Sequence, residues 1–414
     1  MGSAPRNVVI RARPCAPYAE REVEICEHKG IGHPDSIMDG ACEAVARALA
    51  GAYEQAFGHV LHFNVDKGLL VAGKSAPQLG GGKLVEPATL TVCGRAAGGG
   101  QHFDVDELAR AAVDDFLQRS LRADRALFRV APAIKAGSAS LAAIYGTGGA
   151  VHVANDTSFG AGFAPYSRLE QQVLQLAAVL RSSRFHGRFP AAGDDFKIMG
   201  LRHGAALHFT VAIAMIDRHV ATVARYFELK HAVEQVLAQA LPGGTSVQVN
   251  ALDDPGARDE SGLYLTVTGL SAEMGDDGQT GRGNRVSGLI TPGRAMSLEA
   301  AAGKNPLSHV GKIYNVLAHR IAGDIVAGIA AVEEADVQLL STIGQALDRP
   351  QMALVEAGPA AALSAAVTAQ IAQIVNRRLD HVAALTGELA HGLIDVYAGC
   401  AMAGLAGQTD VRHR

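Results

Sequence analysis

Helical and strand patterns alternate along this chain, and no clean linker separates one kind from the other. Apolar residues recur at every fourth position over residues 37–57, which predicts an amphipathic helix. Further helices are predicted at 167–180 and 313–325, and strands at 207–216, 263–268 and 337–342. Because helices and strands follow each other in no regular order, the pattern predicts an α+β fold rather than a regular βαβ array.

The composition limits the partners that the chain can bind. Hydrophobic residues make up 48% and charged residues 19% of the 414 residues, so a sizeable core is expected and disorder is not. The net charge of −4 provides no basic surface for nucleic acid or for an anionic membrane. Any anionic substrate must therefore be held by cations placed locally.

Targeting and redox signals point to a cytoplasmic protein. No apolar run approaches the ~20 residues that cross a bilayer, and the N-terminus lacks a signal-peptide apolar segment. The five cysteines are odd in number and form no CxxC pair, which argues for reduced thiols and against structural zinc.

The densest polar stretch runs from Gly269 to Asn315. It combines adjacent carboxylates, many glycines and five spaced cations: Asp276, Asp277, Arg282, Arg285, Arg294, Lys304 and Lys312. Glycine lets a backbone approach a phosphate closely, while arginine and lysine supply the positive charge that a triphosphate needs. Neighbouring carboxylates suit Mg²⁺ that bridges protein and phosphate. The alternative is a polar surface loop with ordinary ion pairs.

A second candidate is the segment His28–Ser36, which leads into the first predicted helix. His33 and Asp35 stand two residues apart at the helix N-terminus, where N–H groups, a proton donor and a metal ligand could meet an anion. The structural alternative is a helix entrance that Asp35 or Ser36 caps. Three shorter polar motifs are not decisive by composition. Asn155-Asp156 is usually a turn, Asp194-Asp195-Phe196-Lys197 favours a solvated ion-pair loop, and Asp66-Lys67 could equally be exposed.

Taken together, these motifs closely resemble the archaeal-type S-adenosylmethionine synthetase (methionine adenosyltransferase) family. The resemblance is carried in order by HKGIGHPDSIMDG, ANDTSFGAGFAP, GDDFKIMGLR and the block GDDGQTGRGNR…GLITP…AAAGKNP..HVGKIYN. It extends from about Val23 to Asp348, with a weak gap at 97–135 and a poorly matched C-terminal tail.

The resemblance implies three similar α/β subdomains in a pseudo-threefold arrangement and a homodimer with active sites at the interface. The chain is then one multi-lobed catalytic unit over residues 1–414, with approximate lobes at 1–150, 151–260 and 261–414 and interleaved segments. The implied reaction is attack of the methionine sulfur on C5′ of ATP, followed by hydrolysis of the tripolyphosphate to phosphate and diphosphate. Mg²⁺ and K⁺ are the implied cofactors.

The same resemblance assigns roles to individual residues. His33 would lie beside the leaving oxygen, Asp35, Asp276 and Asp277 would bind metal, and Lys197, Arg282 and Lys304 would bind polyphosphate. The remaining substrate-binding candidates are Asp66, Lys67, Gly137, Ser138, Ser140, Asn155, Asp156, Asp195 and Lys312.

Two positions depart from the family pattern. Ser140 stands where the family has an acid that could bind the methionine ammonium group, and Gln345 stands where it has lysine. Losing one partner of a desolvated charged contact typically costs about 2–5 kcal/mol, enough to change substrate preference. Two alternatives therefore stay open: a diverged member that adenosylates a methionine analogue or another nucleophile, and a non-catalytic ATP-binding regulatory subunit.

Overall fold

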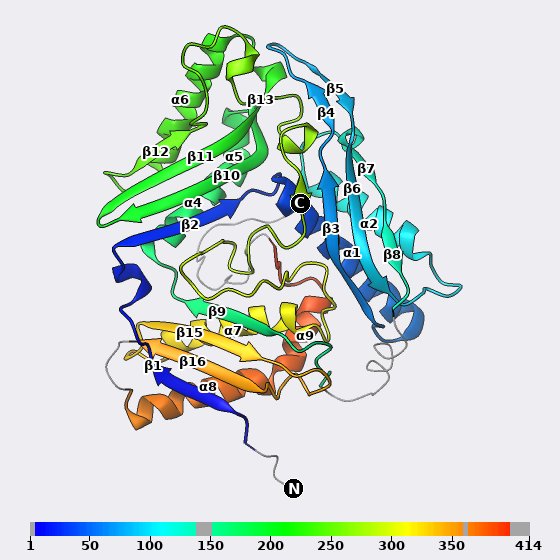
Figure 1. Cartoon of the computed structure of the whole chain (residues 1–414), viewed down its shortest axis with the longest axis vertical. Helices are drawn as coiled ribbons and strands as arrows, with labels where there is room; N and C mark the ends of the chain where they lie inside the picture. Colours follow the sequence, from blue (N-terminus) through cyan, green and yellow to red (C-terminus); the bar gives the residue numbers. More distant parts are fainter. Residues whose placement is uncertain (1–4, 138–150, 359–362, 398–414) are drawn as a thin grey trace.

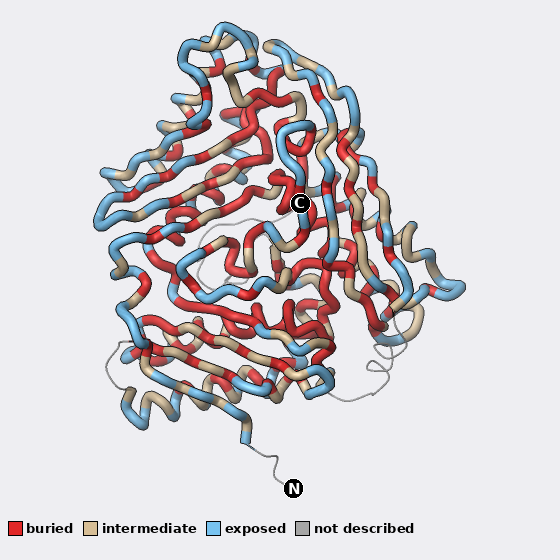
Figure 2. Tube along the Cα trace, in the orientation of Figure 1, coloured by how far each residue is buried: buried red, intermediate tan, exposed pale blue. Residues whose placement is uncertain are grey.

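The computed structural model describes residues 5–137, 151–358 and 363–397. Over these ranges, helices and three sheets of four or five strands enclose a common interior (Figure 1). Buried residues gather in this interior and where helices pack on sheets (Figure 2). The predicted α+β class is confirmed, whereas the pseudo-threefold arrangement of similar subdomains stays a prediction.

One sheet lies mainly in the first third of the chain, with strand order β14-β3-β6-β7 and β8 paired to β6. Its strands are β3 (Phe63–Val71), β6 (Ala88–Ala96), β7 (Phe128–Val130), β8 (Ala133–Lys135) and β14 (Gly278–Gln279). Helices α1 (Pro34–Phe57) and α2 (Val105–Ser120) pack together beside this sheet. A separate pair joins β4 (Lys74–Ala76) to β5 (Lys83–Glu86).

Helix α1 is the element around which the charged residues are arranged. Its core-facing side is apolar, and the helix is buried over most of its length, as expected for a helix with protein on several sides. His33 caps its N-terminus, Pro34 occupies the first turn, and Gly58 ends it in the left-handed conformation at φ 74°. The helix predicted at 37–57 is confirmed and begins three residues earlier.

The second sheet has the strand order β12-β11-β10-β2, and β13 also pairs with β11. Its strands are β2 (Val23–Lys29), β10 (Ala192–His203), β11 (Ala206–Ile216), β12 (Ser246–Val249) and β13 (Leu265–Thr266). The associated helices are α4 (Arg168–Arg181), α5 (Ser183–Arg188) and α6 (Val223–Gln239). The strand predicted at 263–268 is thus only two residues long, because the segment turns away to begin the loop that carries Asp276.

The third sheet has the strand order β1-β16-β15-β9. Its strands are β1 (Val8–Ala12), β9 (Phe159–Ala164), β15 (Glu334–Leu340) and β16 (Met352–Gly358). The associated helices are α7 (Val310–Gly328), α8 (Ala365–Asp380) and α9 (Val382–Ala390). In the described part of the chain, no helix is both long and apolar enough to cross a membrane.

The chain passes repeatedly between the sheets. The N-terminal β1 pairs with β16 near the C-terminus, β2 pairs with β10, and β14 adds to β3 from a position about 200 residues later. The lobe boundaries at 150/151 and 260/261 remain a prediction, and strands from one such segment complete a sheet of another. This exchange brings the loop after β13 against the N-terminus of α1.

Candidate functional site

The first cluster of charged side chains forms where β2 leads into α1. The turn between them is fastened to β10, because the Gly30 N–H donates to the Phe196 carbonyl (2.7 Å) and the Gly32 N–H to the Asp194 carbonyl (3.1 Å). A Cβ on Gly32 would lie 2.5 Å from the Asp194 carbonyl carbon, so this close approach requires glycine. The turn thereby fixes the position of His33.

His33 caps α1 through its ring. Its Nδ1 accepts a hydrogen bond from the Asp35 N–H at 3.2 Å, so the proton of the neutral ring lies on Nε2. Nε2 lies 3.8 Å from Asp276 Oδ2. Burial, and then the positive charge of Lys29, lower the pKa of His33 to about 4. At neutral pH the ring is therefore an uncharged donor directed toward Asp276.

Two carboxylates next to His33 suit a divalent cation. Asp35 Oδ2 accepts from Lys29 Nζ at 2.8 Å, and Oδ1 accepts from the Gln279 N–H at 2.8 Å. Burial and the negative charge of Asp35 raise the pKa of Asp276. The Asp276 side chain is 57% exposed, so it has room for a further ligand. Since a cation would relieve the repulsion between these carboxylates, the donor set fits Mg²⁺.

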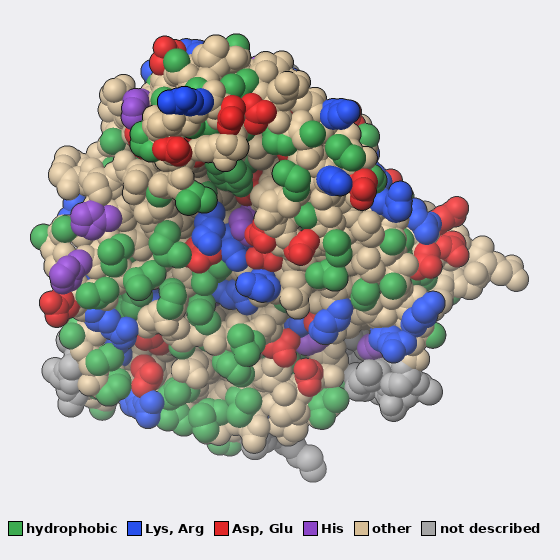
Figure 3. All heavy atoms as spheres, turned by 45° about the horizontal axis from the view of Figure 1, so that its top comes forward, with side chains coloured by type: hydrophobic (Ala, Val, Ile, Leu, Met, Phe, Trp, Pro, Cys, Tyr) green, Lys and Arg blue, Asp and Glu red, His purple; other side chains and the backbone are tan. Residues whose placement is uncertain are grey.

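Basic side chains surround this cluster. Lys197 lies 3.8 Å from Glu27 and is 44% exposed, and the Arg282 side chain is exposed while the Arg282 carbonyl accepts from Lys29 Nζ at 2.8 Å. The charges of Lys197 and Arg282 contribute to lowering the pKa of His33, so both lie in the electrostatic surroundings of its ring. On the face drawn in Figure 3, basic, acidic and histidine side chains gather near the centre, with hydrophobic side chains around them.

A second cluster contains Asp66, Lys304, Glu299 and His309. The buried Lys304 ammonium pairs with Asp66 and also lies 2.9 Å from Glu299, while Lys67 lies 2.8 Å from Asp66. His309 caps α7 as His33 caps α1, because its Nδ1 accepts from the Gly311 N–H at 3.2 Å. Burial, and then the charge of Lys304, lower the pKa of His309 to about 3.

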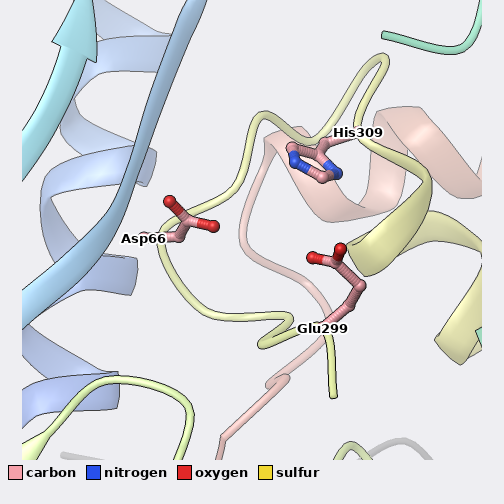
Figure 4. A group of neighbouring side chains, drawn as sticks. All are labelled: Asp66, Glu299 and His309. Carbon is pink, nitrogen blue, oxygen red and sulfur yellow. The ribbon is translucent and has the colours of Figure 1, made fainter. Parts of the chain in front are cut away.

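Asp66, Glu299 and His309 are also close enough together to offer three ligand atoms to a metal ion (Figure 4). Lys304, however, already binds both carboxylates. The ammonium group thus supplies the positive charge that a metal would bring, and a metal would have to displace it. In the carboxylate pair beside His33, Lys29 likewise binds Asp35, but within the described ranges Asp276 has no lysine or arginine within 4.0 Å and its side chain is exposed, so this pair is the better metal site.

Helix α1 links the two clusters. Glu43 accepts from Lys312 Nζ at 2.8 Å and from the Gly303 N–H at 3.0 Å, next to Lys304. Asp35 and Glu43 are eight positions apart, which corresponds to about 12 Å of helix rise. His33, Asp35, Asp276 and Arg282 are brought together as a group, and Lys304 belongs to the second cluster further along the helix.

The other predicted residues differ in their surroundings. Asp195 is buried and accepts from the Ser271 N–H at 2.8 Å, and burial raises its pKa to about 7. Asn155 donates its N–H to the Ser308 carbonyl next to His309, and its buried Oδ1 has no partner among the described residues. Asp277 accepts from the Ala72 N–H at 2.8 Å, and the Asp156 carbonyl accepts from a serine hydroxyl.

The segment with the altered family motif is described only in part. A Cβ on Gly137 would lie 2.8 Å from His62 Nδ1, so this glycine lies close against a side chain of the first sheet's lobe. Ser138 and Ser140 lie outside the described residues.

Several site residues were missed by the sequence analysis. Lys29, Asp39, Glu43, Glu299 and His309 all contact the clusters, although none was singled out. A usable signal was present in α1: Asp35, Asp39 and Glu43 recur every four residues and so share one face of the helix.

The fold and the site define a class of protein. An α+β chain that gathers cations, a neutral histidine and a metal-suited carboxylate pair around a helix N-terminus has the chemistry to handle a metal-bound polyphosphate. Within that class, the model of the S-adenosylmethionine synthetase (AdoMet synthetase) family matches residues 6–393, and the chain belongs to this family.

Individual relatives agree with the family assignment. S-adenosylmethionine synthase of Pyrococcus furiosus is 44% identical over 365 residues, covering 86% of this chain and 90% of the relative. Those of Methanothermobacter thermautotrophicus and Aeropyrum pernix are 40% and 41% identical, each covering 95% of this chain and the whole relative. The family recognised from the sequence motifs is confirmed, and with it the prediction of a transferase.

Proposed function

We propose that this protein is a methionine adenosyltransferase. It converts ATP, L-methionine and water to S-adenosylmethionine, phosphate and diphosphate. The observation that carries the proposal is the buried His33, whose Nε2 lies 3.8 Å from Asp276 and whose pKa the charges of Lys29, Lys197 and Arg282 help to lower. This is an arrangement suited to a polyphosphate leaving group, because it combines one hydrogen-bond donor with concentrated positive charge.

The proposed reaction places its electrostatic demand on the leaving group. The methionine sulfur becomes a sulfonium as the C5′–O bond breaks, and the electron pair of that bond stays on the tripolyphosphate. Lys197, Arg282 and Lys304 bind the polyphosphate oxygens, and His33 Nε2–H donates to the leaving oxygen. The same groups then hold the tripolyphosphate while water cleaves it. Alignment of the sulfur with the C5′–O bond supplies further acceleration.

Asp35 and Asp276 are the residues proposed to hold Mg²⁺. When bound, the ion neutralises polyphosphate charge and orients its oxygens. One oxygen of Asp277 accepts from the Ala72 N–H, so the second oxygen is the one proposed to help Asp35 and Asp276 bind Mg²⁺. K⁺ is proposed as a second cofactor on the strength of the family, and its residues are not assigned.

A homodimer is proposed as the active form. Apolar side chains stand on the outward faces of two sheets, with Val23 and Ile25 on β2 and Leu69 and Val71 on β3, each at least 42% exposed. Such residues are those that a second copy would cover. If the active sites lie at that interface, the Lys304 cluster of one copy and the His33 cluster of the other bind the same polyphosphate.

One assay tests the reaction. Purified protein is incubated with ATP, Mg²⁺, K⁺ and methionine, and S-adenosylmethionine and phosphate are measured together. Both products, each dependent on methionine, are expected. Polyphosphate release only with another acceptor would instead favour the diverged enzyme, and ATP binding without turnover would favour the regulatory subunit. A parallel reaction without K⁺ measures its requirement.

A further inference from the structure

Two side chains form hydrogen bonds with the backbone of the loop that carries Arg282: Asp39 of α1 and Arg285 of the loop itself. Asp39, the middle one of the three acidic residues that recur every four positions in α1, accepts a hydrogen bond from the Gly281 N–H at 2.7 Å. Arg285 donates to the Gly281 carbonyl and, at 2.8 Å, to the Gly283 carbonyl. The two residues that flank Arg282 are thus both bonded to this pair through their backbones.

The two residues that flank Arg282 must be glycine for this arrangement to form. A Cβ on Gly283 would collide with Asp39 Oδ2, and Gly281 has a φ of +88°, a conformation that favours glycine. Gly283 is buried, whereas the Arg282 side chain between the two glycines is exposed. The backbone is therefore fastened on its inner side while the guanidinium group faces outward.

The polar side chains that bond the loop also line a cavity. Asp39, Gly281 and Arg285 are among its lining residues. Burial raises the pKa of Asp39 to about 7, and burial likewise lowers the pKa of Arg285. Desolvated charged groups of this kind add little stability compared with apolar side chains of the same size, and a role in fixing one conformation is the better explanation.

We infer that Asp39 and Arg285 are positioning residues for Arg282, and that they clamp its backbone so that its guanidinium group meets the polyphosphate. This inference deepens the proposed function and rests on it for the identity of the ligand. It predicts that loss of the clamp acts through Arg282, so the effects of changing Asp39 and Arg282 must not add.

The experiment is a double-mutant cycle read by binding of inorganic tripolyphosphate with Mg²⁺ to the full-length protein, measured by calorimetry. Asp39→Asn keeps the shape and one acceptor oxygen but puts an N–H donor in place of the oxygen that lies against Gly283. It should weaken binding by about tenfold, the scale expected when a binding group is misplaced by less than 1 Å. In the Arg282→Ala background, Asp39→Asn should change binding by less than about twofold. The kcat and KM of each variant are measured alongside.

A matched control removes the same charge elsewhere. Asp253 is buried, is bonded to Lys230 at 2.9 Å and to the Tyr264 N–H at 3.0 Å, and follows β12 in the chain. Asp253→Asn should lower thermal stability as Asp39→Asn does but leave tripolyphosphate binding unchanged. If Asp39→Asn does not fold, Arg285→Lys replaces it in the cycle, because lysine keeps the charge but loses the planar fork that reaches two carbonyls.

The positioning role of Asp39 and Arg285 would be refuted if the losses of tripolyphosphate affinity in the cycle were additive. It would also be refuted if Asp39→Asn or Arg285→Lys bound tripolyphosphate with wild-type affinity. Absence of tripolyphosphate binding in the wild type would overturn it too. A wild type that binds tripolyphosphate but makes no S-adenosylmethionine would refute only the proposed reaction.

Discussion

Replacement of His33 separates its structural role from its chemical role. The ring caps α1 through Nδ1, which accepts from the Asp35 N–H, and presents the Nε2 proton to the site. His33→Ala removes both functions. His33→Asn restores a side-chain oxygen that can accept the same N–H, because asparagine is among the preferred N-cap residues. The two variants together therefore isolate the contribution of Nε2.

The expected magnitudes differ for the two roles. Loss of the cap in His33→Ala should cost about 1 kcal/mol of stability, and His33→Asn should recover most of it. Loss of one preorganised donor to developing charge typically lowers kcat by about 10²–10³-fold, and both variants should show that loss. Since the pKa of His33 is lowered to about 4, its protonation should not reduce the wild-type rate above pH 5 or so.

The assay is the initial rate of S-adenosylmethionine formation at saturating ATP and methionine, with urea denaturation of each variant in parallel. A His33→Asn variant within a few-fold of the wild-type rate would remove His33 from the chemistry and leave it a cap. A His33→Asn variant as unstable as His33→Ala would show that the cap has been misassigned.

Three further outcomes are expected. Asp276→Asn should raise the Mg²⁺ concentration that gives the half-maximal rate at least about tenfold. Its stability should stay within about 0.5 kcal/mol of the wild type, because the Asp276 side chain is largely exposed. An unchanged Mg²⁺ dependence would contradict the assignment of Asp276 to the metal site. Gly32→Ala should destabilise the protein by about 1–3 kcal/mol in urea unfolding, since its Cβ would press on the Asp194 backbone, and a neutral effect would refute the close approach. Burial lowers the pKa of His28 to about 4. The contribution of the neutral ring to folding stability is therefore complete above about pH 6.5, and up to about 3 kcal/mol of it is lost as the pH falls toward 4. His28→Phe should lose less stability between pH 7 and 5 than the wild type, and equal losses in the two proteins would contradict this reasoning.

Local sequence patterns predicted the elements well where the pattern and the tertiary contacts agree. The four-residue apolar repeat marked α1, and the β-rich run at 207–216 marked β11 (Ala206–Ile216). The run at 263–268 failed as a strand beyond Leu265–Thr266, because side-chain hydrogen bonds from the following turn hold its later residues in the loop that carries Asp276. Glu273, for example, accepts from the N–H groups of Val267 and Thr268 at 2.8 and 2.7 Å.

The candidate site shows the same division. The motifs named His33, Asp35, Asp276 and Arg282, because residue type and glycine spacing reflect the chemistry of phosphate and metal. They did not predict Glu299, which reaches Lys304 from an irregular segment with no pattern of its own. Nor did they indicate that Asp66 and Lys304 form a cluster separate from that of His33.

The amino-acid order alone determined the family, the helix entrance at His33 and the kinds of group available for the chemistry, because these depend on residues within a few positions of one another. Only the tertiary structure decided which groups meet. Asp35 bonds the backbone of Gln279, 244 residues away, and Glu43 bonds Lys312, 269 residues away. Such contacts arise because buried α1 must satisfy its carboxylates with N–H groups and cations from whichever segment packs against it, and that choice is made by the fold as a whole.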